Sequence, residues 1–179
     1  MTLQVLVIAV VRIVGSLPVL RWPLAGGLLA IAVDLSDLLL RDALDLGGVP
    51  DYQSLDKWLD QVYLALFLVV ALRWRGLARQ VAIALFAFRF VGFVLFELGG
   101  DRSVLLLFPN VFEFWFLLVA AIHRFRPDIT LTPRATAVAL AVVAPLKEAQ
   151  EWALHGGRIF DGLSSIDALR LVWRWLTGS

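Results

Sequence analysis

The chain has 179 residues, of which 60% are hydrophobic and 17% are charged, and its formal net charge is +1. Soluble proteins average about 45–50% apolar and about 25% charged residues, so a water-soluble domain of this length would expose too much apolar surface. The scattered basic residues exclude a nucleic-acid-binding protein, and the absence of cysteine excludes disulfides, thiolate metal sites and thiol catalysis.

Long apolar segments follow one another along the chain. A membrane-spanning helix needs about 20 mostly apolar residues, and by that rule the sequence predicts an all-α, polytopic transmembrane helix bundle, a single integral membrane domain over residues 1–179. Pro23 is typical of a helix start, and Pro145 predicts a kink inside the last span. The six expected spans cover about residues 3–20, 23–40, 56–72, 77–98, 103–122 and 133–155.

The final segment, residues 163–176, predicts a different kind of helix. Its apolar residues fall on one helical face and its charged residues on the opposite face. Because it is too short and too charged to span a bilayer, it predicts a C-terminal amphipathic helix that lies in the membrane interface.

Arginines gather in the loops after the first, third and fifth expected spans. Such an excess of basic residues is typical of cytoplasmic loops, so these loops are expected to face the cytoplasm and both termini to lie outside. Arg41, Lys57 and Arg102 lie on the other side and reduce the bias. The loop arginines are Arg21, Arg73, Arg75, Arg79, Arg124, Arg126 and Arg134.

Acidic residues gather on the opposite, outer side of the expected bundle. Asp128 alone belongs to an expected cytoplasmic loop. Asp34 and Asp37 are three residues apart, so both project from one side of the second span. Asp56 and Asp60 are four apart and do the same at the start of the third span. The sequence therefore predicts an outward-facing acidic polar site.

The sixth span adds a stripe of polar side chains. Glu148, Glu151 and His155 stand at i, i+3 and i+7, which places two carboxylates and an imidazole on one face. Such a stripe can hold a metal ion or a proton, so these three residues are the candidate catalytic residues. The cofactor that this pattern suggests is a divalent cation, and the candidate metal ligands are Asp34, Asp37, Glu113, Glu148, Glu151 and His155.

Charges placed well inside the expected spans do not balance. The five acids are Asp34, Asp37, Glu113, Glu148 and Glu151, whereas the three bases are Arg12, Arg89 and Lys147, a surplus of two acids. Each intramembrane charge costs about 2.5–3.5 kcal/mol on insertion scales. A surplus therefore requires protons, a bound cation or a water-filled vestibule.

A structural interpretation of the same charges stays open. Arg12 can pair with Asp34 or Asp37 across the first hairpin. Arg89 can pair with Glu113 or Glu148, and Lys147 with Glu151 one turn along its own helix. Pairs of this kind fix helix packing and carry no catalytic or transport duty.

Two further patterns bear on the site. In the segment LFPNVFEFWF, Pro109 frees a backbone carbonyl next to Asn110 and Glu113, which favours either a polar site or a packed kink. His123 stands at the cytoplasmic end of a span and is expected to be solvated. The tryptophans expected to anchor the bundle at the two membrane interfaces are Trp22, Trp58, Trp74 and Trp152.

Two short stretches resemble uncharacterised bacterial multi-pass inner-membrane proteins of the VanZ-like and YjdF-like kind. They are SLDKWLDQVYLALF, residues 54–67, and KEAQEWALHGGRIFDG, residues 147–162. The shared features are an Asp-Lys pair that opens one span and a glutamate-rich, tryptophan-containing motif near the end of the last span. Asp60 departs from the pattern, because a histidine is expected there. The resemblance implies a location in the bacterial plasma membrane and no particular activity.

Three functions remain open at this point. The first, which the acid surplus favours, is a membrane protein that binds or moves a cation or proton. The second is a metal-dependent enzyme acting on a lipid-linked substrate at the outer leaflet, although the sequence has no G-x-S-x-G or H-E-x-x-H motif. The third is a structural or assembly subunit. The partners expected are the lipid bilayer and either a second copy of the chain or another membrane protein, with no nucleic acid.

Overall fold

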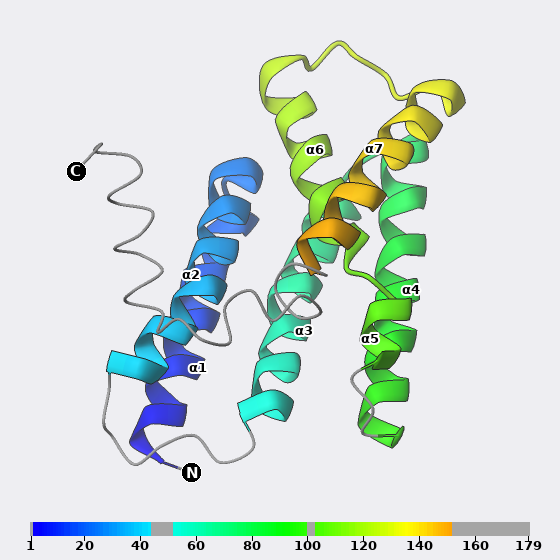
Figure 1. The fold of residues 1–179 in the computed structure, drawn as a ribbon. Helices are drawn as coiled ribbons and strands as arrows, with labels where there is room; N and C mark the ends of the chain where they lie inside the picture. Colours follow the sequence, from blue (N-terminus) through cyan, green and yellow to red (C-terminus); the bar gives the residue numbers. More distant parts are fainter. Residues whose placement is uncertain (1, 44–51, 100–102, 152–179) are drawn as a thin grey trace, which may run out of the picture.

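The computed structural model describes residues 2–43, 52–99 and 103–151 (Figure 1). The expected tail helix over residues 163–176 and the candidate residue His155 lie outside these ranges. Within them every regular element is a helix, which confirms the all-α prediction. The elements are α1 (Leu3–Ser16), the 3-10 helix η1 (Leu17–Leu20), α2 (Pro23–Ala43), α3 (Tyr52–Ala71), α4 (Gly76–Gly99), α5 (Ser103–Leu107), α6 (Val111–Phe125) and α7 (Pro133–Glu151).

Successive helices alternate in direction along the bundle, except that α5 and α6 run the same way (Figure 1). α1 packs mainly on α2, α3 on α4 and α1, and α6 on α2, α4 and α7. The connections after η1, α3 and α6 lie together at one end of the bundle, which is the upper end in Figure 1. We call it the arginine end, because it carries the arginines expected in cytoplasmic loops, namely Arg21, Arg73, Arg75, Arg79, Arg124, Arg126 and Arg134. The start of α1, the start of α3 and the end of α4 lie at the opposite end.

The polarity of α1 is reversed relative to a helix of a soluble protein. Thr2 caps the helix, since its Oγ1 accepts a hydrogen bond from the N–H of Val5 at 3.3 Å. The buried residues of α1 follow a spacing of four along one face and most of them are polar: Gln4, Ile8, Arg12 and Ser16. The exposed large side chains of the same helix are all apolar: Leu3, Leu6, Val10, Ile13 and Val14.

An aromatic core holds α3, α4 and α6 together near the arginine end. The rings of Phe67 and Phe116 stack with centroids 4.1 Å apart, and Trp74 stacks on Phe116 at 5.3 Å. The indole N–H of Trp115 donates to the carbonyl of Ala78 at 3.1 Å. Trp74 is only 8% exposed, so it packs inside the end of the bundle instead of anchoring its surface.

Two of the described helical segments, Leu3–Leu20 and Gly76–Gly99, are long and apolar enough to cross a membrane by length and composition. Two of the other expected spans fail this criterion for identifiable reasons. α3 begins with the charged residues Asp56, Lys57 and Asp60, and the expected segment 103–122 is split at Pro109 into the short α5 and the 15-residue α6. The count of six spans stays a prediction.

The turn from η1 into α2 depends on Gly26. A Cβ at this position would collide with the backbone of Pro18 and Val19. We expect Gly26→Ala to lower the free energy of unfolding by about 1–3 kcal/mol, as overpacking in a well-packed core does. The measurement is thermal unfolding of the detergent-solubilised protein. Gly99→Ala is the control, because a Cβ there meets nothing within 4 Å, and equal stability of both variants would contradict the close approach.

Candidate functional site

One buried guanidinium joins three helices. Arg12 of α1 has a side chain that is 3% exposed, and it donates from Nη1 to Asp56 Oδ1 at 2.8 Å and from Nη2 to Asp60 Oδ1 at 2.7 Å. Nη2 also pairs with Asp34 of α2. The planar fork of donors on arginine suits this arrangement, because it can serve several carboxylates at once. Arg12 therefore ties α1 to α2 and α3 at the same point.

Lys57 completes this group. Its Nζ donates to Asp56 Oδ2 at 2.7 Å and to Asp60 Oδ2 at 3.2 Å. We call Arg12, Asp34, Asp56, Lys57 and Asp60 the aspartate cluster. Counted over the described side chains, it sets three carboxylates against two bases, so the contacts leave one negative charge uncompensated within the cluster.

The aspartate cluster is buried on one side and reachable on the other. The side chain of Asp60 is 10% exposed, whereas those of Asp34 and Asp56 are 25% and 21% exposed. One carboxylate oxygen from each of the three aspartates lies within 4.8 Å of the other two. Three hard oxygen ligands at that spacing suit a small cation, provided that Arg12 and Lys57 give up some of their hydrogen bonds.

A second buried network surrounds Glu113 at the start of α6. Lys147 of α7 pairs with Glu113 Oε1 at 3.2 Å, and both side chains are less than a tenth exposed. Glu113 Oε2 accepts hydrogen bonds from the hydroxyl of Tyr63 at 2.8 Å and from Asn110 Nδ2 at 3.1 Å. Lys147 also donates to Gln150 Oε1 at 2.8 Å. We call these five residues the glutamate network.

The polar face of α3 runs between the two groups. Asp56, Asp60 and Tyr63 stand at i, i+4 and i+7, so they share one side of the helix. The first two belong to the aspartate cluster and Tyr63 belongs to the glutamate network. Titratable side chains from α1, α2, α3, α6 and α7 thus line one polar region of the bundle.

Arg89 of α4 supports the break between α5 and α6. Its Nη1 donates to the carbonyls of Phe108 at 2.8 Å and Leu105 at 3.3 Å, groups that helix termination at Pro109 leaves without a helical partner. Gly92 allows the close approach, because a Cβ there would collide with the side chain of Phe108. Within the described residues Arg89 does not pair with Glu113 or Glu148, the acids expected as its partners.

The candidates from the sequence separate into three sets. Asp34 lies in the aspartate cluster, where it makes the expected pair with Arg12, while Glu113 lies in the glutamate network. Glu148 is exposed on α7. The side chains of Asp37 and Glu151 lie outside the described residues, as does His155.

Asp56 and Asp60 belong to the acidic site expected from the sequence, and they meet Asp34 around Arg12, although only Asp34 or Asp37 is expected as the partner of Arg12. The sequence does not single out Lys57, Tyr63 or Gln150 as members of the site. The signal that finds Tyr63 is its position seven residues after Asp56 on the face that already carries Asp60. Gln150 stands three residues after Lys147, within reach on the same helix.

No protein-family model, no curated protein and no solved structure matches the chain. The resemblance to VanZ-like and YjdF-like proteins therefore stays a prediction. What defines the class of protein is its own geometry over the described residues: a helical bundle in which two helical segments are long and apolar enough to cross a membrane, with a buried network of charged side chains.

Proposed function

We propose that the chain is a multi-pass membrane protein whose buried charged residues bind or pass a proton or a cation within the bundle. Support for the membrane location comes from the reversed polarity of α1, with Gln4, Arg12 and Ser16 inside and apolar side chains outside. Charged side chains in membrane helices face the bundle interior in the same way, because contact with the lipid hydrocarbon is energetically costly for them. α4 follows this pattern, since Ala78, Ala82, Arg89 and Gly92 are among its buried residues.

The observation that carries the proposal is the charge count of the aspartate cluster. Its three carboxylates contact two bases among the described residues, and two of the carboxylates are partly exposed. In a low-dielectric interior an uncompensated charge is costly. A proton on one carboxylate, or a cation bound among them, removes that cost. The partly exposed sides of Asp34 and Asp56 provide the entry.

The break between α5 and α6 supports the same function. Discontinuous helices in membrane proteins place backbone and polar side chains at substrate and ion sites near the middle of the bilayer. Here the break precedes Asn110 and Glu113, and Glu113 joins Tyr63 to Lys147. Proton relays in membrane proteins are built from carboxylates and similar titratable groups facing the bundle interior. The glutamate network is therefore the inner continuation of the site.

The proposed topology follows from the arginine end. With the loops that contain Arg73 and Arg126 in the cytoplasm, the start of α1 and the start of α3 face outward. The aspartate cluster then opens toward the outside of a plasma membrane crossed six times. A pathway through so few helices requires a second copy of the chain to enclose it.

Asp34→Asn tests the proposal, because it removes the surplus negative charge and keeps a side-chain oxygen that can accept from Arg12. We expect proton or cation uptake into proteoliposomes of the purified protein, followed with a pH-sensitive dye and with ion-selective dyes. In the variant, the rate of uptake is expected to fall about tenfold or more, because a directly participating group has been removed. Asp128→Asn, which alters an exposed carboxylate at the arginine end, is the matched control and should keep it.

Unchanged uptake in Asp34→Asn would contradict the proposal. Metal content measured by mass spectrometry on the same preparations separates it from the enzyme alternative. Stoichiometric divalent metal in the wild type that disappears in Asp34→Asn would favour a metal-dependent enzyme, for which the carboxylate spacing of 4.8 Å or less is the supporting observation. Equal uptake and no metal in either protein would favour the third function, a structural subunit in which the charge pairs only fix helix packing.

A further inference from the structure

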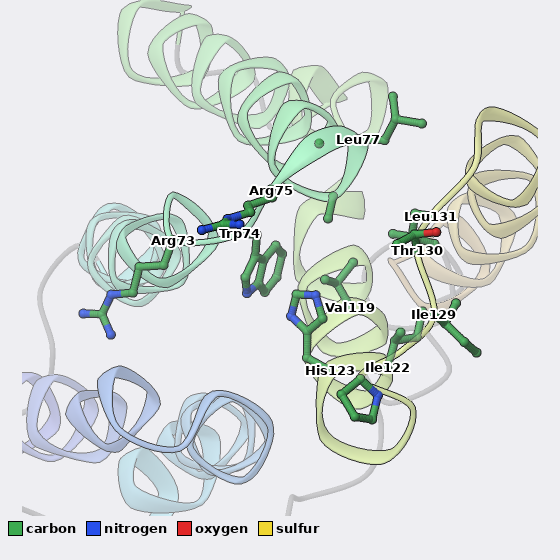
Figure 2. Close-up of a pocket in the computed structure, with 13 residues that line it drawn as sticks. Arg73, Trp74, Arg75, Leu77, Val119, Ile122, His123, Ile129, Thr130 and Leu131 are labelled. Carbon is green, nitrogen blue, oxygen red and sulfur yellow. The ribbon is translucent and has the colours of Figure 1, made fainter.

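A pocket of about 460 Å³ lies at the arginine end, away from the aspartate cluster. It forms where the connection between α3 and α4 meets the last turn of α6 and the connection to α7 (Figure 2). Its walls are largely apolar, with Trp74, Val119, Ile122 and Leu131 among them. A pocket of this volume falls in the range of about 300–1,000 Å³ that is typical of small-molecule sites.

The titratable residues of this pocket are all basic. Arg73, Arg75 and His123 line it, and among the described residues no carboxylate does. Arg73 is held by the carbonyl of Leu20 at 3.1 Å, and Figure 2 shows its guanidinium pointing away from Trp74 and His123. The His123 ring meets the edge of Trp74, with centroids 5.6 Å apart.

Arg75 is the basic group available to a ligand. It is exposed, and it makes no hydrogen bond or ion pair with any described residue. Arg73, in contrast, already contacts a carbonyl. Figure 2 shows the Arg75 guanidinium directed toward the Arg73 side, so it must turn toward the pocket to contact a ligand there. An exposed guanidinium without a partner among the described residues can turn in this way, and it can then bind a phosphate through two parallel hydrogen bonds.

The first turn of α4 adds a second attraction for anions. Gly76 begins α4 with φ of +59° and, with Leu77 and Ala78, lines the pocket. The first N–H groups of a helix have no helical acceptor, and together with the helix dipole they favour negative charge. Apart from its two chain neighbours and the backbone of its own helix, nothing described lies within 4 Å of the position that a Cβ of Gly76 would take, which leaves room for a ligand at this turn.

We propose that this pocket binds the phosphate-bearing headgroup of an anionic membrane lipid. The inference rests on the proposed membrane location. A phosphate contacts Arg75 and the start of α4, and the apolar wall of Val119, Ile122 and Leu131 packs against the lipid's glycerol and upper acyl carbons. Basic pockets between helices on the cytoplasmic side of membrane proteins bind such headgroups. The apolar wall favours a lipid over a free phosphate ion, because only the lipid has apolar groups that can pack against it.

The test is titration of the detergent-purified full chain with phosphatidylglycerol and with phosphatidylcholine, read by native mass spectrometry and by thermal shift. We expect phosphatidylglycerol to bind more tightly, and Arg75→Gln to weaken its binding about fivefold, which is what one arginine near a lipid surface contributes. Arg79→Gln is the matched control, since Arg79 is exposed at the same end and does not line the pocket. The Arg79→Gln variant should bind phosphatidylglycerol as tightly as the wild type does.

Three results would overturn the proposal. They are equal binding of the two lipids, an equal loss in Arg79→Gln, and displacement of phosphatidylglycerol by millimolar inorganic phosphate, which would assign a free anion to the pocket. Asp34→Asn should bind phosphatidylglycerol normally, because it lies at a different part of the bundle. A failure of lipid binding is therefore distinguishable from a failure of cation or proton uptake.

Discussion

Arg12→Leu is expected to lower the free energy of unfolding by about 3–5 kcal/mol, which is the usual cost of removing one partner from a buried ion pair. The physical reason is that Asp60 stays buried and loses its hydrogen bond from Nη2 at 2.7 Å. Asp34 and Asp56 lose the same partner, so carboxylates of two helices repel one another. Thermal or denaturant unfolding of the detergent-solubilised protein, followed by circular dichroism, measures the loss.

Two companion variants make this result specific. Arg21→Gln alters an exposed arginine at the end of the same hairpin, and we expect a change within about 0.5 kcal/mol. Arg12→Lys keeps the charge but cannot bridge the three carboxylates with one planar group, so its stability should fall between those of the wild type and Arg12→Leu. An Arg12→Leu protein as stable as the wild type would show that the aspartates do not depend on Arg12.

Stability alone does not account for the buried charges. The desolvation of two ions often exceeds their mutual attraction, and apolar residues of similar size frequently replace buried ion pairs without loss of stability. The bundle already has an apolar and aromatic core around Phe67 and Phe116. A cluster of three carboxylates and two bases in the same bundle therefore supports the proposal of a bound proton or cation.

The sequence predicts the helical class and one of the charge pairs well. Apolar runs without strand periodicity indicate helices, and the turn at Arg21 and Trp22 places α1 and α2 side by side. Arg12 and Asp34 lie at similar depth on these two neighbours, so the hairpin limits the expected partners of Arg12 to Asp34 or Asp37, and the structure pairs Arg12 with Asp34. Local sequence information is sufficient when two residues belong to adjacent antiparallel helices.

The remaining partners depend on information that is not local. Asp56 and Asp60 reach Arg12 because of how α3 is rotated against α1, and hydrophobic patterning does not fix that rotation when a helix begins with polar residues. Glu113 meets Lys147 because the break at Pro109 resets the start of α6. Likewise, Trp74 and His123 meet at a pocket wall only once the connection after α3 has packed against the last turn of α6.

The glutamate network predicts that a substitution in α7 lowers the free energy of unfolding as much as Arg12→Leu does. Lys147→Met removes the base that pairs with Glu113 at 3.2 Å. Among the described residues, the buried carboxylate then keeps hydrogen bonds only from the neutral groups Tyr63 and Asn110. We expect a loss of about 3–5 kcal/mol in the free energy of unfolding. Glu148→Gln, at the adjacent and exposed position, is the control and should change it by about 0.5 kcal/mol or less.

A double variant then separates pairing from packing. Glu113→Gln keeps the acceptor for Tyr63 and Asn110 but leaves Lys147 buried opposite a neutral side chain, so on its own it also destabilises. When Glu113→Gln and Lys147→Met are combined, both members of the ion pair are removed together, and the loss should be smaller than the sum of the single losses by about 0.5–3 kcal/mol. Strictly additive losses would mean that the two charges do not stabilise one another, and the glutamate network would then be a set of independent packing contacts.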